Sequence, residues 1–154
     1  MEKNVQIWID ADSCPNLVRS HVVKIGAQLN LQIYFVANRK IDCSFNAPYK
    51  MIICTNEKDS ADNYILQNAK ENDLVITRDI VFADRLLEKN ITCINDRGTI
   101  FTKDNIKPLL SSRNFDLELS NLGLVEHHKE GYDKKKFALF ANAFDKTIHK
   151  LLKK

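Results

Sequence analysis

Apolar runs that end at acidic residues are the feature that most constrains the fold of this chain. Three acidic segments follow predicted β-strands: Asp10 to Asp12, Asp59 to Asn63, and Arg78-Asp79. The first and third follow their strands directly, and the second follows after a three-residue spacer. The strands are apolar throughout rather than alternating, which is typical of a parallel sheet that is covered on both faces. Acidic residues at the carboxyl ends of such strands meet at one edge of the sheet, where open α/β folds bind their ligands.

Helical patterns separate the predicted strands. We expect strands at residues 5–9, 31–36, 50–55, 73–77 and 91–94, and helices at 15–28, 60–70 and 80–89. This alternation predicts right-handed βαβ crossovers and an α/β fold. From residue 102 onward the pattern is helical, and the last helix has an apolar stripe from Phe137 to Leu151. We therefore expect a single domain over 1–154, with an α/β core at 1–100 and a helical C-terminal extension at 101–154.

Composition and charge limit the class of protein. The chain has 154 residues, of which 44% are hydrophobic and 28% charged, as in an ordinary soluble globular protein. It contains no apolar run of roughly 20 residues, and its first strand begins where a signal peptide would lie, so we expect a cytoplasmic protein that does not engage a membrane. Residues 126–154 carry eight Lys and four acidic residues. Such a basic segment attracts nucleic acid, but on charge alone a solvated helix face is the simpler interpretation.

The acidic segments also predict a metal site. Carboxylates gathered at one edge repel one another unless a cation neutralises them, and their hard oxygens suit Mg²⁺ or Mn²⁺. Asp12, Asp59 and Asp79 each stand where a helix begins, so any one of them could instead be a helix cap. Three such segments beside three strand ends favour a shared metal site. From the residues alone we expect a metal-dependent enzyme that acts on phosphate esters.

Several motifs resemble a known family. They are IWIDADSCPN at 7–16, VAN at 36–38, ADN at 61–63, DLVITRDI at 73–80, RG at 97–98 and RNF at 113–115. Their order and spacing resemble those of the uncharacterised bacterial YaiI/YqxD family, which is grouped with PIN-like domains. The resemblance implies a three-layer α/β/α PIN-like (Rossmann-like) fold. Where that family has Ala before the last acidic residue of the DLVITRDI segment, this chain has Arg78, which could contact phosphate or pair with a carboxylate.

PIN domains are typically Mg²⁺- or Mn²⁺-dependent ribonucleases, so the resemblance implies a nuclease with a preference for RNA over DNA. Mapped onto this chain, the catalytic residues are Asp10, Asp62 and Asp79, and the metal ligands are these three with Asp12 and Asp59. The candidate substrate-binding residues are Arg78, Arg97, Asn63, Asn38 and Ser13. PIN relatives often dimerise, so a homodimer is a further expectation.

Two other functions remain open from the sequence. The Asp10-Ala11-Asp12 segment after the first strand is also typical of haloacid-dehalogenase-type phosphatases, in which the first Asp is a nucleophile. Alternatively, the chain is a catalytically silent PIN-like module that binds RNA or a protein partner and keeps its carboxylates for stability.

Overall fold

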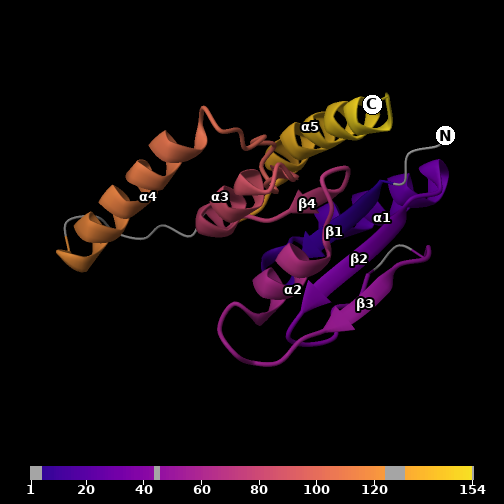
Figure 1. Cartoon of the computed structure of the whole chain (residues 1–154), viewed down its shortest axis with the longest axis horizontal. Helices are drawn as coiled ribbons and strands as arrows, with labels where there is room; N and C mark the ends of the chain where they lie inside the picture. The colour runs from indigo at the N-terminus through magenta and orange to yellow at the C-terminus, as the bar shows by residue number, and fades with distance from the viewer. Residues whose placement is uncertain (1–4, 44–45, 124–130, 154) are drawn as a thin grey trace.

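The computed structural model describes residues 5–43, 46–123 and 131–153, and Figure 1 shows how their elements are arranged. Within these residues, five parallel strands form one sheet in the order β3-β2-β1-β4-β5. The strands are β1 (Gln6–Asp10), β2 (Gln32–Ala37), β3 (Lys50–Ile53), β4 (Leu74–Ile76) and β5 (Thr92–Ile94). The helices are η1 (Ala11–Ser13), α1 (Asn16–Leu29), α2 (Ser60–Asn68), α3 (Ile80–Glu88), α4 (Ile106–Asn121) and α5 (Lys134–Lys153).

Helices cover both faces of the sheet, which gives three layers. Along β1, Ile7 and Ile9 pack into one core with residues of α1 and α5, whereas Trp8 packs into a second core with residues of α2 and α3. Since side chains of a strand alternate between faces, a strand that is apolar at every position needs both cores. The chain therefore has the predicted α/β class, with a three-layer α/β/α Rossmann-like arrangement and a C-terminal helix.

The two C-terminal helices differ in how they meet the body. Phe140 and Phe144 of α5 are fully buried against α1 and the sheet, as the apolar stripe predicted. In α4, Ile106 is buried, but Phe115 is exposed, as is Leu122 directly after the helix, because the second half of α4 extends away from the body (Figure 1). None of the helices in the described ranges combines the length and apolar character that crossing a lipid bilayer requires.

The loop after β1 departs from the simplest sequence prediction. Cys14 is extended, with φ −90° and ψ 129°, and Pro15 is the N-cap of α1 rather than its first helical residue. A residue before proline is sterically pushed out of the helical region, which keeps Cys14 extended, and α1 begins at Asn16, one residue later than predicted. The short helix η1 fills the gap between Asp10 and Cys14, and it places Asp12 beyond the end of β1.

The topology places the acidic residues in a crevice. The chain builds β2 and β3 on one side of β1, and then β4 and β5 on the other side. β1 and β4 are therefore neighbours at the point where the strand order reverses, and their parallel register sets Ile9 beside Ile76. Ligands of open α/β sheets bind outside the carboxyl ends of the strands at this switch point.

Candidate functional site

Asp10 and Thr77 link the ends of the two central strands. The Thr77 hydroxyl donates a hydrogen bond of 3.0 Å to Oδ2 of Asp10, and the same hydroxyl accepts the Asp79 backbone N–H at 3.1 Å. Thr77 is almost fully buried, so its hydroxyl is held in place by packing. It orients the Asp10 carboxylate at the switch point.

Asp62 enters the same region from the first turn of α2. Its side chain is buried, and none of the described residues donates a hydrogen bond to it. The pKa of Asp62 is raised from 3.8 to about 7, chiefly by burial and also by repulsion from Asp10, Asp79 and Asp59, against the opposing charge of Arg85. A carboxylate that is largely removed from water and has no hydrogen-bond donor is costly to ionise.

The pKa of Asp10 is also raised. The pKa of Asp10 is raised to about 6, chiefly by burial and also by repulsion from Asp12 and Asp79, although the Thr77 hydrogen bond and the charge of Arg78 lower it. Because Asp79 raises the pKa of both Asp10 and Asp62, and Asp10 also raises that of Asp62, the three predicted catalytic residues form one electrostatic cluster. The fold has thus brought together acids from three segments of the sequence.

Asp79 is also a helix cap. Its Oδ1 accepts the backbone N–H groups of Val81 and Phe82 at 3.0 and 3.2 Å, which satisfies two of the free N–H groups at the start of α3. Its Oδ2 receives no hydrogen bond from the described residues. The capping and cluster interpretations of this residue are therefore compatible.

Asp12 and Asp59 lie at the rim. Asp12 accepts the Asn38 backbone N–H at 3.0 Å and lies 3.9 Å from Nε of Arg39. Asp59 has left-handed backbone angles, with φ 62°, and its side chain does not cap α2. Both residues line a pocket of about 250 Å³, which we call the acidic pocket. Its lining includes Asp10, Asp12, Asn38, Asp59 and Asp62.

The acidic pocket fits a divalent cation by its chemistry. With the side chains as they stand, no group of three His, Cys, Asp or Glu residues in the described part of the chain is arranged to hold a metal ion. The donors are nevertheless hard carboxylate oxygens whose mutual repulsion a cation would relieve. Asp10 and Asp62 line the pocket and Asp79 does not, so binding at all three would involve movement of side chains toward the ion.

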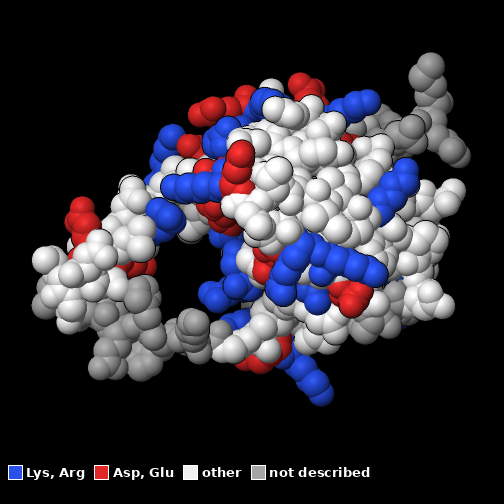
Figure 2. Space-filling view, turned by 90° about the horizontal axis from the view of Figure 1, so that it is seen from below, with Lys and Arg blue, Asp and Glu red and all other residues white. Residues whose placement is uncertain are grey.

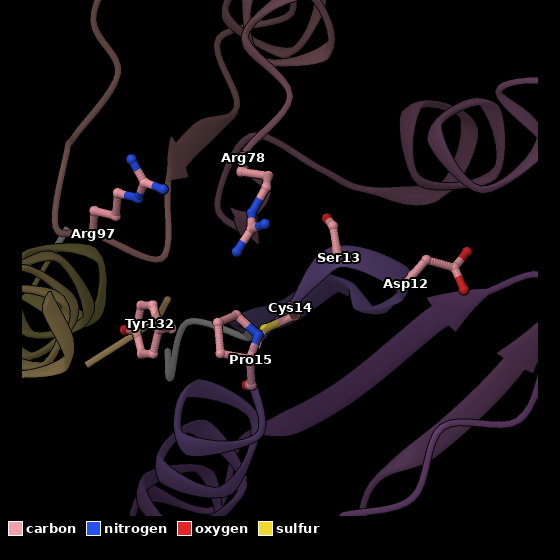
Figure 3. A pocket seen from close by; sticks show the side chains of 7 residues that line it. All are labelled: Asp12, Ser13, Cys14, Pro15, Arg78, Arg97 and Tyr132. Carbon is pink, nitrogen blue, oxygen red and sulfur yellow. Dashed lines mark hydrogen bonds between the residues drawn. The ribbon is translucent and has the colours of Figure 1, made fainter. Parts of the chain in front are cut away.

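A second pocket lies beside the first, and we call it the basic pocket (Figure 3). It has a volume of about 430 Å³ and is lined by Asp12, Ser13, Cys14, Pro15, Arg78, Arg97 and Tyr132. Arg78 forms an ion pair with the buried Asp96, which follows β5, so its carboxylate partner is Asp96 rather than Asp79. The Tyr132 hydroxyl donates a hydrogen bond of 2.6 Å to the backbone oxygen of Asp96.

The other predicted substrate-binding residues are divided between pockets. Ser13, Arg78 and Arg97 line the basic pocket, whereas Asn38 lines the acidic pocket. Asn63 lies in neither, because it faces a separate hollow between α2 and α3 that it shares with Arg85. The structure therefore does not bring Asn63 to the candidate substrate residues.

Sequence reasoning missed Thr77, Asp96 and Tyr132. Asp96 comes two residues after the predicted strand 91–94, so the rule that found Asp10 and Asp79 could have found it too. Thr77 was assigned to a strand, where its hydroxyl carried no signal. Tyr132 gave no signal at all, because its contact with Asp96 spans 36 residues of sequence.

Comparison with known proteins places the chain among bacterial relatives. The family described as "Uncharacterized BCR, YaiI/YqxD family" matches residues 8–150. A UPF0178 protein of Treponema denticola is 44% identical over 97% of this chain and 95% of the relative. UPF0178 proteins of Psychromonas ingrahamii and Treponema pallidum are 40% and 39% identical, each over 96% of this chain, and over 97% and 83% of the relative. No solved structure matches the chain.

Proposed function

The chain belongs to the YaiI/YqxD family, and from the geometry of its own residues we propose that it is a Mg²⁺- or Mn²⁺-dependent nuclease that hydrolyses phosphodiester bonds. The observation that carries this proposal is the electrostatic cluster of Asp10, Asp62 and Asp79 at the switch point. Burial and mutual repulsion raise the pKa of Asp10 to about 6 and that of Asp62 to about 7. Strongly perturbed carboxylates in a crevice are typical of functional sites.

Each residue of the two pockets would have a distinct role in hydrolysis. Asp10, Asp62 and the free oxygen of Asp79 would hold the cation, with Asp12 and Asp59 at the rim of the pocket. A cation bound there lowers the pKa of a water molecule and stabilises the charge that develops on phosphate. Thr77 keeps Asp10 oriented, and Arg78 and Arg97 approach from the basic pocket, where they would bind phosphate oxygens.

Nucleic acid is the substrate class that this arrangement favours. A phosphodiester chain has repeated anionic groups, and the chain offers cations beside its carboxylates as well as exposed lysines along α5. Figure 2 shows Lys and Arg side chains gathered across the middle of one face, with acidic side chains among them. The preference for RNA rests on the resemblance to PIN domains, since fold and charge do not distinguish the two polymers.

The test is cleavage of RNA and DNA oligonucleotides with Mn²⁺, with Mg²⁺ or with a chelator. We expect metal-dependent cleavage by the wild type. In Asp10→Asn, which keeps the shape of the side chain, the cleavage rate should fall by at least about 100-fold. Asp84→Asn is the matched control, because Asp84 lies on α3 and pairs with Lys107 at 3.6 Å, outside both pockets.

Other results would support the alternatives. Metal-independent RNA binding without cleavage by folded protein would favour a silent binding module. A covalent phosphoaspartate at Asp10, trapped from a phosphorylated small molecule, would favour a dehalogenase-type phosphatase. Equal cleavage by wild type and Asp10→Asn would contradict the proposal.

A further inference from the structure

We propose that the basic pocket binds the terminal nucleotide of the substrate, and that it recognises a phosphate monoester at the end of the nucleic acid chain. This inference rests on the proposed function and gives it a substrate class, namely strands with a phosphorylated end. The pocket supplies the two kinds of group that such a nucleotide needs: cations for its phosphate and an aromatic ring for its base.

The cations are two arginines with different environments. Arg78 is anchored by Asp96, which is only 3% exposed and whose backbone oxygen is held by the Tyr132 hydroxyl. A guanidinium has five N–H donors, so this ion pair leaves others available to a ligand. Arg97 is exposed, and no carboxylate of the described residues is paired with it. One anchored and one unpaired arginine can together bind a phosphate monoester, which carries close to two negative charges near neutral pH.

Tyr132 supplies the aromatic surface. It lines the pocket next to Arg97, while its hydroxyl is fixed on Asp96 (Figure 3). Stacking on an aromatic ring binds a base of any type, because every base has a π-face. The volume of about 430 Å³ lies in the range of small-molecule sites, and it exceeds the space that a phosphate ion alone would occupy. A whole nucleotide therefore suits the pocket better than phosphate by itself.

Asp12 connects the two pockets, since it lines both of them. A terminal nucleotide in the basic pocket would therefore lie beside the carboxylates of the acidic pocket. The phosphodiester that joins this nucleotide to the rest of the strand is then the bond nearest to Asp10 and Asp62. This arrangement predicts removal of nucleotides from a phosphorylated end, rather than cleavage within a strand.

The first test is calorimetric binding to metal-free protein in the presence of a chelator. The probes are a nucleoside 5′-monophosphate, a nucleoside 3′-monophosphate, the unphosphorylated nucleoside and inorganic phosphate. We expect one of the two nucleotides to bind at least 10-fold more tightly than the nucleoside and than inorganic phosphate. Which of them binds identifies the end of the strand that is recognised.

Variants then assign the binding to the pocket. Arg97→Gln and Tyr132→Leu should each weaken nucleotide binding about 10-fold or more, with circular dichroism to confirm that both are folded. Arg113→Gln is the matched control, because Arg113 is an exposed arginine on α4 and should bind like wild type. Nucleotide binding that Arg97→Gln leaves unchanged would overturn the proposal, and so would equal binding of nucleotide and inorganic phosphate.

Cleavage assays separate this inference from the proposed function. Oligonucleotides with a 5′-phosphate, with a 3′-phosphate or with hydroxyl groups at both ends are compared in the presence of Mn²⁺. Metal-dependent cleavage at the same rate for all three kinds of end, together with no nucleotide binding, would overturn the terminal-nucleotide site and still support the nuclease proposal. Nucleotide binding that depends on Arg97, without cleavage of any strand, supports the site and contradicts the nuclease.

Discussion

Buried carboxylates at the two edges of the sheet differ in how many hydrogen bonds they accept. At the amino edge, Asp73 accepts the Gln6 backbone N–H at 3.1 Å, the Trp8 indole N–H at 3.0 Å and the Lys70 backbone N–H at 2.9 Å. At the carboxyl edge, Asp10 receives one hydroxyl, and Asp62 receives no donor from the described residues. Asp73 and Asp62 are both buried, so burial alone does not explain why only Asp73 is supplied with hydrogen-bond donors.

The two carboxylates differ in whether the fold supplies hydrogen-bond donors for them. Asp73 is matched by donors that the fold itself provides, so it serves stability and ties β1 to the turn before β4. Asp62 is buried beside other acids and is left without donors, which is costly for the folded chain alone. We propose that an external cation completes this arrangement.

Removing Asp73, whose carboxylate accepts three hydrogen bonds, should have the largest effect on stability. Asp73→Ala leaves three N–H groups without their acceptor, two of them on the backbone, so we expect the free energy of unfolding to fall by about 3 kcal/mol or more. Urea denaturation measures the loss, with the exposed Asp104→Ala as the control. A loss below about 1 kcal/mol would show that water replaces Asp73 easily, and the contrast between the edges would weaken.

Removing the charge of Asp62, which has no hydrogen-bond donor among the described residues, should increase stability rather than lower it. Asp62→Asn removes a charge that burial and the repulsion of Asp10 and Asp79 make costly, so at pH 8 without metal we expect the free energy of unfolding to rise by at least about 2 kcal/mol. The same denaturation experiment measures it. Destabilisation by this variant under these conditions would contradict the electrostatic description of the cluster.

The pH dependence should isolate the same group. The pKa of Asp62 is about 7 in the folded chain and 3.8 ordinarily, so between these values the folded state binds more protons than the unfolded state. Its stabilising contribution is complete below pH 3.8 and is lost as pH rises through about 7. We expect the advantage of metal-free Asp62→Asn over wild type to grow by about 1 kcal/mol between pH 6 and pH 7. Thermal melts across this range measure the difference between the two proteins, and a constant difference would contradict the raised pKa.

The rim of the acidic pocket should matter least for stability. Arg39 is largely exposed and lies 3.9 Å from Asp12, so Arg39→Gln should change the free energy of unfolding by about 0.5 kcal/mol or less. Urea denaturation at low and high salt measures this effect. A larger change would mean that Asp12 depends on Arg39 for its position, and that the rim is more tightly organised than its exposure indicates.

Much of the fold followed from patterns that are local in sequence. Apolar runs located all the strands, and the spacing of Phe140, Phe144 and Ile148 located the buried face of α5. Acids at strand ends located Asp10 and Asp79, because strand direction decides which edge a following residue occupies. These inferences need no knowledge of which strands are neighbours.

The parts that sequence did not predict depend on that knowledge. The ion pair of Arg78 with Asp96 exists because β4 and β5 are adjacent, and the role of Asp73 depends on its position beside β1. The sequence left two roles open for Asp79, and the structure shows that one oxygen caps α3 while the carboxylate still repels Asp62. Such dual roles depend on orientation, which residue spacing does not encode.

Titration with Mn²⁺, followed by the paramagnetic resonance signal of the free ion, tests directly whether a cation completes the carboxyl edge. We predict that wild type and Asp84→Asn bind Mn²⁺ alike, and that Asp10→Asn and Asp62→Asn bind it at least 10-fold more weakly while remaining folded. Equal binding by wild type and Asp62→Asn, or no binding by the wild type, would show that the carboxyl edge is not completed by a cation.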